Sequence, residues 1–310
     1  MKNILIYTHM PNFSFIDGGT VVQYLLAKTL EEYGQNIRIY PRSGIKTNNS
    51  IFSKFYDNDF PIDNNCVVIY CEGTTGNPLN AKNVVRWMLS KLGQNVPYTH
   101  VNTWGKNELV YYFNSEEKIA NNSDKLGNLY KMLNIIYIHP SANNYNLKSR
   151  KGTCFTYRKT INTHGTKTID IHPPNSFEIT KNHTQLECIK IFNNHTYFIS
   201  YDSSTFLSVI SALCGCVSIV KKVSGLSKQN WLNTTAACEY LKESGENTLY
   251  GIAYGRDDLQ NAIKTLHLAK QQWNKINEYM KQTTIIPFLD DIKNLDNIKY
   301  LENTVKNNFD

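Results

Sequence analysis

Apolar residues along the chain form short continuous runs that alternate with stretches of helical periodicity. Residues 3–7 read Asn-Ile-Leu-Ile-Tyr, a run typical of a strand buried on both faces. Apolar residues recur with helical spacing from Val21 to Leu30, Gly34 supplies a stop, and a second apolar run follows at 37–40. This succession of strand, turn, helix and strand predicts a parallel pair joined by a right-handed crossover.

The same alternation recurs along the rest of the chain. We expect further strands at 66–71, 153–157, 168–171, 197–200, 217–220 and 250–254, and helices at 81–92, 183–192, 203–214 and 257–280. A polar, proline-containing stretch at 140–146 reads as a linker between the two series. The pattern therefore predicts an α/β fold of two doubly wound, Rossmann-like domains facing across a cleft, the default place for a ligand.

The linker sets the expected domain limits. We place an N-terminal domain at 1–147, a C-terminal domain at 148–285 and a helical tail at 286–310. Apolar residues of the tail recur with helical spacing from Leu289 to Leu301, which suits packing within the chain or association into a homo-oligomer.

Composition and charge narrow the classes of partner. The 310 residues are 41% hydrophobic and 19% charged, as in ordinary globular proteins, and the net charge is +7. A positive balance of this size suits nucleic acid, an anionic membrane surface or a phosphorylated ligand. The basic residues are spread along the chain without a run or a nucleic-acid-binding motif, so we expect no nucleic-acid partner.

Cysteine usage and the N-terminal sequence bear on location. The seven cysteines form no CxxC pair and mostly lie in apolar runs, as expected of small buried side chains in a reducing compartment. The N-terminal apolar run is too short for a signal peptide, and no stretch approaches the roughly 18 apolar residues of a membrane span. We expect a cytoplasmic protein from an AT-rich genome, acting in the host cytoplasm if the source is viral.

The strongest candidate for a ligand site follows the strand expected at 197–200. The residues there are Tyr201, Asp202, Ser203, Ser204 and Thr205. Hydroxyls at a helix start make a pocket suited to phosphate, although the same residue types are ordinary helix caps. Arg158 and Lys159 directly follow the strand expected at 153–157 and are expected at the same edge. They are either ligands of a diphosphate or solvated surface cations.

Three side chains in the N-terminal half are candidate general bases. Glu72 is the first residue after the strand at 66–71 that can point out of the sheet, but it could instead cap a loop or pair with Arg86. His9 and Asp17 lie on the equivalent loop after the first strand. Positions where a ligand could approach the backbone of these loops are Gly18, Gly19 and Asn77.

Several well-defined motifs are absent from the sequence. It contains no GxxxxGK[ST], GxGxxG, HExxH, GxSxG or EF-hand pattern, which argues against the protein classes that these motifs mark. Asp57-Asn58-Asp59 matches the Asp-x-Asp of metal-dependent sugar transferases. It precedes a strand rather than ending one, so we interpret it as a polar turn and expect neither a metal ion nor a cofactor.

Several stretches together carry a resemblance to a known family. They are Glu72, Gly76-Asn77-Pro78-Leu79-Asn80, His172-Pro173-Pro174, Tyr201-Asp202-Ser203-Ser204-Thr205, Cys214-Gly215-Cys216 and Gly251-Ile252-Ala253-Tyr254-Gly255. They resemble a little-characterised group of glycosyltransferase-like proteins associated with surface-polysaccharide synthesis, and the layout of the chain resembles the GT-B glycosyltransferases. The resemblance covers most of the chain to about residue 290 and is densest from 158 to 255.

The resemblance implies a nucleotide-sugar donor bound by the C-terminal domain, a glycan-type acceptor, no metal, and a final helix returning toward the first domain. Arg158 and Lys159 resemble the basic pair that many such enzymes place against the donor diphosphate. Asp202 resembles the first acid of a Glu-x7-Glu pattern, but the second acid falls on Ile210, which cannot hydrogen-bond. This departure favours an inverting transfer. The alternatives are a sugar-nucleotide epimerase and a non-catalytic nucleotide- or sugar-binding module.

Overall fold

The computed structural model describes residues 2–9, 18–42, 52–57, 59–93, 95–106, 108–113, 130–157, 170–203 and 205–295. Contacts divide the chain into two compact units, Met1–Tyr137 with Tyr279–Asp310, and Ile138–Glu278. These units differ from the domain limits expected from the sequence over 138–147 and 279–285. The C-terminal segment belongs to the first unit.

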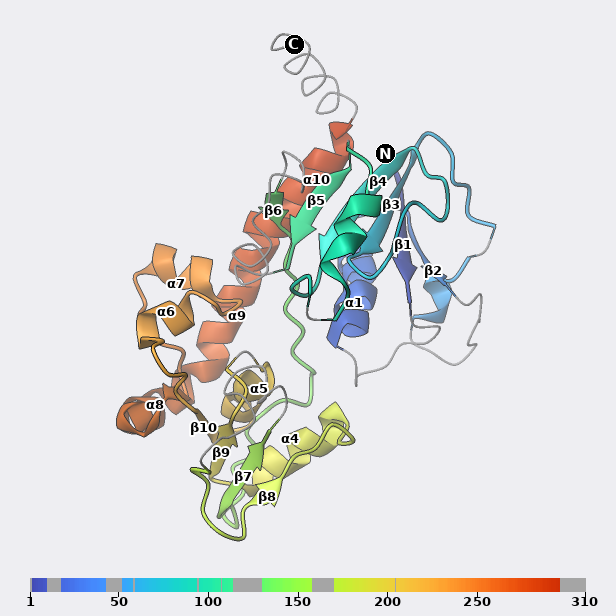
Figure 1. Cartoon of the computed structure of the whole chain (residues 1–310). Coiled ribbons are helices and arrows are strands. Elements are labelled where there is room, and N and C mark those ends of the chain that lie inside the picture. The colour runs from blue at the N-terminus through green and yellow to red at the C-terminus, as the bar shows by residue number, and fades with distance from the viewer. Residues whose placement is uncertain are drawn as a thin grey trace. The chain divides into compact units, whose positions relative to one another are not determined.

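The first unit is built on one parallel sheet in the order β2-β1-β3-β4-β5-β6 (Figure 1). Its strands are β1 (Asn3–Thr8), β2 (Ile37–Pro41), β3 (Cys66–Cys71), β4 (Asn83–Met88), β5 (Leu109–Tyr112) and β6 (Tyr130–Met132). Its helices are α1 (Gly18–Glu32), α10 (Ile286–Lys293) and the 3₁₀ turns η1 (Ser53–Phe55) and η2 (Tyr98–Thr103).

Both faces of this sheet are covered. On one face Ile4 and Val85 pack in a core with Leu26 of α1 and Phe288 of α10. On the other face Tyr70 and neighbouring strand residues pack against loop side chains, in a cluster that includes Phe60 and Ala81. Strands buried on both faces carry continuous apolar runs, which explains why β1 and β3 were recognisable in the sequence.

The helix predicted at 81–92 is wrong, because Asn83–Met88 forms strand β4 in the interior of the sheet. All six of its residues are buried. A strand covered on both faces shows no alternation of polar and apolar side chains, so its apolar positions also fit helical spacing. The adjacent β-branched residues Val84 and Val85 favour the strand.

The second unit is built on a parallel sheet in the order β11-β10-β9-β7-β8. Its strands are β7 (Thr153–Thr156), β8 (Phe177–Glu178), β9 (Tyr197–Ser200), β10 (Val217–Val220) and β11 (Ile252–Tyr254). Its α-helices are α4 (Gln185–Asn194), α5 (Leu207–Leu213), α6 (Lys228–Leu232), α7 (Cys238–Ser244), α8 (Leu259–Thr265) and α9 (Ala269–Met280). Two doubly wound parallel sheets confirm the predicted α/β class.

Several predicted boundaries in this unit shift. The strand expected at 168–171 begins outside the described residues, and Asp170 and Ile171 lie in a loop, so the edge strand is β8 instead. Helix α5 begins at Leu207, four residues after the predicted start. The helix predicted at 257–280 is divided into α8 and α9 by the 3₁₀ turn η4 (Leu266–Leu268).

Helical segments follow one another from residue 256 to 293 and end in the first unit. A π-helical turn, η5 (Lys281–Ile285), leads into α10. There Asp291 accepts hydrogen bonds from Tyr111 Oη at 2.7 Å and Lys131 Nζ at 2.7 Å, and α10 runs beside β5 and β6 (Figure 1). Among the described helices none is long and apolar enough to cross a membrane.

Asp291 is expected to fasten α10 to the sheet. Asp291→Ala leaves the buried Tyr111 hydroxyl without its acceptor, so the free energy of unfolding should fall by about 1–3 kcal/mol. Chemical denaturation followed by circular dichroism measures this change. Asp290→Ala, an exposed carboxylate on the same helix, is the control and should alter stability by less than about 0.5 kcal/mol. Equal effects of the two substitutions would contradict the role of Asp291.

All seven cysteines are buried and free, as expected from the sequence. Burial raises the pKa of the Cys66, Cys71 and Cys214 thiols to about 12. These thiols are therefore protonated at pH 8, and thiolate is the reactive form. We expect a thiol-reactive chromophore to label none of the seven rapidly in the native protein and all seven after denaturation. Rapid native labelling would show that this packing opens readily.

Candidate functional site

The strand order of each sheet creates one point where its loops diverge. In the first unit the chain passes from β1 to β2 on one side, and β3 then lies on the other side of β1. In the second unit β8 and β9 flank β7 in the same way. Ligands of open parallel sheets bind outside the carboxyl ends of the strands at such a switch point. The candidate site residues are therefore those that follow β1 and β3 in one unit and β7 and β9 in the other.

At the switch point of the first unit, His9 lies against the backbone of Gly73. The residue after β1 is His9, and Gly73 follows β3 by two residues. A Cβ atom at Gly73 would lie 2.6 Å from His9 Nε2, so only glycine leaves room for the imidazole. The structure thus brings together two loops that the sequence separates by more than sixty residues.

Glu72 is a buried carboxylate whose two oxygens both accept hydrogen bonds. Oε2 accepts from the Leu89 backbone N–H at 2.9 Å, and Oε1 accepts from Ser90 Oγ at 2.6 Å. Only 7% of the residue is exposed. Of the two structural roles expected from the sequence, Glu72 therefore caps the segment after β4. It does not pair with Arg86, whose partner is Glu108.

Arg86 holds the loop that carries Glu72 and Gly73. Its side chain, on the central strand β4, is fully buried and binds Glu108 through Nε at 2.6 Å and Nη2 at 3.0 Å. Two further N–H groups donate to the backbone carbonyls of Thr74 at 3.0 Å and Gly76 at 2.5 Å. The five-donor fork of arginine suits such an arrangement, which a lysine ammonium could not reproduce.

The rings of Tyr70 and Trp104 complete the surroundings of this guanidinium. Their centroids lie 5.0 and 5.2 Å from its central carbon. The Tyr70 hydroxyl donates to Asn77 Oδ1 at 2.9 Å, and Asn77 also bonds the backbone of Ala81 in both directions. The Asn77 amide thus closes the loop on itself.

The remaining candidates of the first unit lie around the start of α1. Gly18 is exposed, and a Cβ there would meet no atom of the described residues within 4 Å. Gly19 is half-buried in the first turn. Asp17 lies outside the described residues. Its place as a candidate base stays a prediction.

At the switch point of the second unit, Tyr201 organises the neighbouring loop. Its hydroxyl accepts from the backbone N–H groups of Ile171 at 2.6 Å and His172 at 3.3 Å, and lies 2.8 Å from His172 Nδ1. Tyr201 is fully buried, and burial raises the pKa of its hydroxyl. It can shape a ligand site through the residues that it holds.

Two further side chains belong to this cluster and were not among the predicted site residues. His172 stacks on Phe155 of β7 with ring centroids 3.7 Å apart and planes 7° apart. Lys221, directly after β10, places Nζ 5.2 Å from the Tyr201 ring centroid. Burial lowers the pKa of its ammonium, and the nearby Asp170 opposes this shift. The position of Lys221 after an apolar strand was the sequence signal that could have identified it.

The structure describes only some of the other candidate residues of the second unit. Asp202 is buried, with its backbone bonded to Ser200 Oγ, and the Ser203 carbonyl accepts from Trp231 Nε1 at 2.9 Å. Thr205 Oγ1 accepts from the Leu207 N–H at 3.3 Å, in the ordinary manner of a residue before a helix. Arg158, Lys159 and Ser204 lie outside the described residues, and their phosphate contacts stay a prediction.

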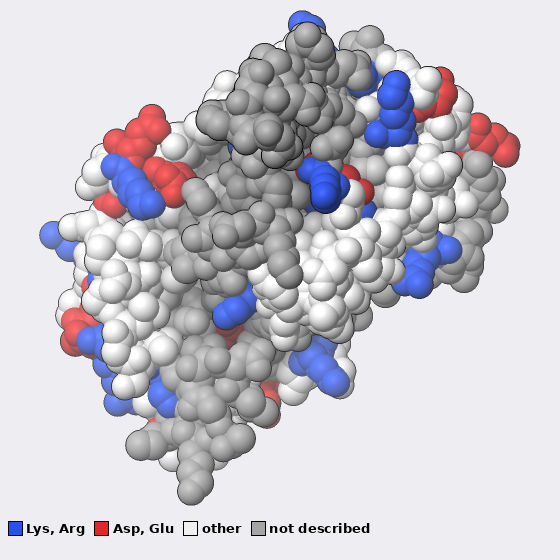
Figure 2. Space-filling model, turned by 45° about the horizontal axis from the view of Figure 1, so that its top comes forward, with Lys and Arg blue, Asp and Glu red and all other residues white. Residues whose placement is uncertain are grey.

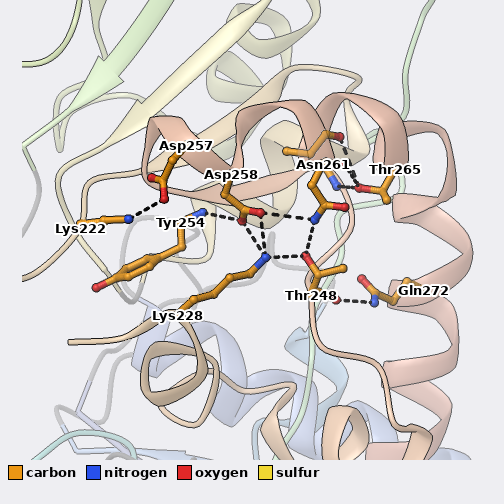
Figure 3. Close-up of polar contacts among 11 residues, drawn as sticks. Lys222, Lys228, Thr248, Tyr254, Asp257, Asp258, Asn261, Thr265 and Gln272 are labelled. Atoms are coloured by element: carbon orange, nitrogen blue, oxygen red, sulfur yellow. Dashed lines mark hydrogen bonds and ion pairs between the residues drawn. The ribbon is translucent and has the colours of Figure 1, made fainter.

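Two lysines near the ends of β10 and β11 are engaged with carboxylates (Figure 3). Lys222 pairs with Asp257 at 2.7 Å, and Lys228 pairs with Asp258 at 2.8 Å. Asp258 also accepts from the Tyr254 backbone N–H at 3.1 Å. The second pair is the less exposed, and it ties the turn after β11 to the start of α6. We interpret these ion pairs as structural supports of the loops that follow β10 and β11.

Neither a charged surface patch in the coloured part of Figure 2 nor a group of metal-ligating side chains among the described residues points to a further site. Over the coloured part of Figure 2, Lys and Arg side chains stand apart and are interspersed with Asp and Glu rather than gathered in one broad patch. Among the described residues no three His, Cys, Asp or Glu side chains are grouped so that they could hold a metal ion. The expected independence from metals stays a prediction.

Comparison with known proteins found similarity at the level of structure. No protein-family model matches the chain, and no curated protein matches it. The chain is similar to a solved structure described as the crystal structure of T4 phage BGT in complex with its UDP-glucose substrate. The TM-score is 0.46 at 11% sequence identity, and the match covers 92% of this chain and 96% of that chain.

Arg86 is expected to be the most costly polar side chain to remove from the first unit. Arg86→Leu removes the donor from two carbonyls and from the Glu108 carboxylate, whose side chain is only 10% exposed, and should lower the free energy of unfolding by about 3–5 kcal/mol. Chemical denaturation followed by circular dichroism measures this loss. Replacing both Arg86 and Glu108 by Leu should lower the free energy of unfolding by a smaller amount, since no charge is then left without a partner.

The matched control is Lys54→Ala, which breaks an ion pair with Glu31 whose side chains are 58% and 43% exposed. Screening by water should limit its effect to about 0–1 kcal/mol. If Arg86→Leu costs no more than this control, the guanidinium does not hold the loop.

Proposed function

We propose that this protein is a glycosyltransferase that moves a sugar from a nucleotide-sugar donor to a hydroxyl of a glycan-type acceptor without a metal. The observation that carries the proposal is the pair of switch-point clusters. His9 lies against Gly73, the residue after Glu72, in one unit, and Tyr201 lies with His172 and Lys221 in the other. Two doubly wound sheets with a C-terminal helix returned to the first unit are also the layout that the GT-B resemblance implies.

In this proposal the second unit binds the nucleotide sugar. The cluster after β7, β9 and β10 combines aromatic rings with a cation, which suits a ligand that has a planar base and a diphosphate. Arg158, Lys159 and the hydroxyls from Ser203 to Thr205 remain the proposed partners of the diphosphate. Stabilising the negative charge that develops on this leaving group is the largest catalytic contribution available to such a site.

The first unit supplies the general base. Of the three candidates we favour His9, because both oxygens of Glu72 are engaged with Leu89 and Ser90. The imidazole takes the proton of the acceptor hydroxyl as its oxygen attacks the anomeric carbon. The bond from that carbon to the diphosphate breaks, and the nucleoside diphosphate leaves with the bonding electron pair. A single displacement of this kind inverts the configuration at the anomeric carbon.

Binding of the leaving group is the first test. Calorimetric titration with UDP, GDP, TDP, ADP and CMP should reveal saturable binding of at least one nucleotide at submillimolar to millimolar concentration. Absence of binding for all five at millimolar concentration would overturn the proposal. Incubating the bound nucleotide's glucose or galactose conjugate without an acceptor separates transfer from epimerisation, because an epimerase converts the donor alone.

Removal of the base is the second test. His9→Ala should lower the rate of sugar transfer or donor hydrolysis about 10²- to 10⁴-fold with little change in nucleotide affinity, since the base acts only on the acceptor proton. His267→Ala, an exposed histidine on η4, is the control and should behave as wild type. Glu72→Gln and Asp17→Asn tested alongside decide among the three candidates. If all three substitutions leave the rate unchanged, the proposed base assignment is wrong.

A further inference from the structure

The loop after β7 presents a flat ring at the switch point of the second sheet. The imidazole of His172 lies parallel to the ring of Phe155, with centroids 3.7 Å apart. Phe155 is buried in the sheet, whereas His172 is partly exposed. Tyr157 and Tyr201 are inclined to the imidazole by 73° and 84°, and the Tyr201 hydroxyl lies at the edge of the ring, 2.8 Å from Nδ1, so neither tyrosine stacks parallel on its second face.

Hydrogen bonding fixes the orientation of this ring. The Tyr201 oxygen accepts from two backbone N–H groups, those of Ile171 and His172. A phenol oxygen has two acceptor positions, so the Tyr201 hydroxyl proton remains to be donated to His172 Nδ1 at 2.8 Å. The ring proton of the neutral imidazole then lies on Nε2. The Phe155 ring beneath the imidazole and the Tyr201 hydroxyl at one edge leave the His172 side chain little freedom to rotate.

We propose that His172 is the platform on which the nucleobase of the nucleotide sugar stacks. The inference rests on the proposed function and adds the recognition of the base to it. A pre-oriented aromatic face loses little conformational entropy on binding, and base stacking on such a face tolerates any of the bases. Lys221 Nζ stands 5.2 Å from the ring of Tyr201, so a cation lies near the same group that holds His172. In this proposal the nucleobase stacks on His172 and the phosphates lie near Lys221, and both of these residues contact the buried Tyr201.

The alternative ligand parts fit this feature less well. A phosphate group would use only the Nε2 N–H at the edge of the His172 ring and would leave the flat face of the imidazole unused. A planar base gains dispersion and stacking over the whole imidazole face. The proline pair that follows, Pro173-Pro174, restricts the backbone beside the ring and favours a fixed platform over a mobile loop.

Nucleotide and pyrophosphate binding to the full-length protein tests the platform. Dissociation constants of UDP, GDP and ADP, and of inorganic pyrophosphate, are measured by calorimetry for wild type and variants. His172→Ala should weaken the nucleotides that bind wild type by about 5- to 150-fold and leave pyrophosphate unchanged. His172→Phe keeps a flat ring and should stay within about threefold of wild type. His267→Ala is the control for the loss of an exposed histidine and should change neither ligand.

Two further measurements distinguish stacking from an indirect effect. Tyr201→Phe removes the acceptor of the Ile171 and His172 backbone N–H groups as well as the bond to the imidazole, so it releases the loop that carries the ring, and it should weaken nucleotide binding several-fold while pyrophosphate binds as before. In wild type, the base protons of bound nucleotide should move upfield in ligand-observed NMR, because they lie over an aromatic ring, and this measurement needs no variant.

Nucleotide affinity that is unchanged in His172→Ala, or an equal loss of nucleotide and pyrophosphate binding, would overturn the platform while leaving the proposed function standing. Failure of wild type to bind any nucleotide would overturn the proposed function itself, and the platform with it.

Discussion

The order of the parallel strands brings the candidate residues of each unit to one edge of its sheet. In each unit a strand from the start of that unit lies inside the parallel sheet, and the strands that follow it pair on either side. Parallel strands all end at the same edge, so the loops after β1 and β3, and those after β7 and β9, must meet there. That convergence puts His9 against Gly73 and His172 against Phe155 and Tyr201. No local feature of the chain could do so.

A buried polar side chain with several partners helps to hold each of these edges. Arg86 satisfies two loop carbonyls and Glu108, and the hydroxyl of Tyr201 satisfies two loop N–H groups and His172. Burying a guanidinium or a phenol is costly unless every polar atom finds a partner. Once the partners are in place, the loop has few alternative conformations of similar free energy. Polar residues inside the core therefore specify the shape of the two edges.

The sequence predicted more of the fold than of the site. Strands such as β1, β3 and β9 were recognised from their continuous apolar runs, but β5 was not predicted. Strand β4 was assigned to a helix, because burial on both faces removes the alternation that marks a strand. Position after a strand was enough to select His9, Glu72 and Tyr201 as candidates. It could not show that Glu72 is engaged by Ser90, or that Tyr201 is buried beneath the residues it positions. His172 belongs to the His-Pro-Pro stretch that carries the family resemblance. The sequence indicated no role for it, because its stacking partner Phe155 is seventeen residues away.

By itself, the sequence determined the α/β class, the two series of strands and helices, and the loops in which polar residues follow strands. These properties are local, since hydrophobic periodicity and turn residues act over a few positions. Three contacts could be seen only in the folded chain: Asp291 joins the C-terminal helix to Tyr111 and Lys131, Arg86 pairs with Glu108, and His172 lies flat on Phe155. Each of these contacts joins residues from different elements, so it exists only once strand order has been set by the burial of whole sheets.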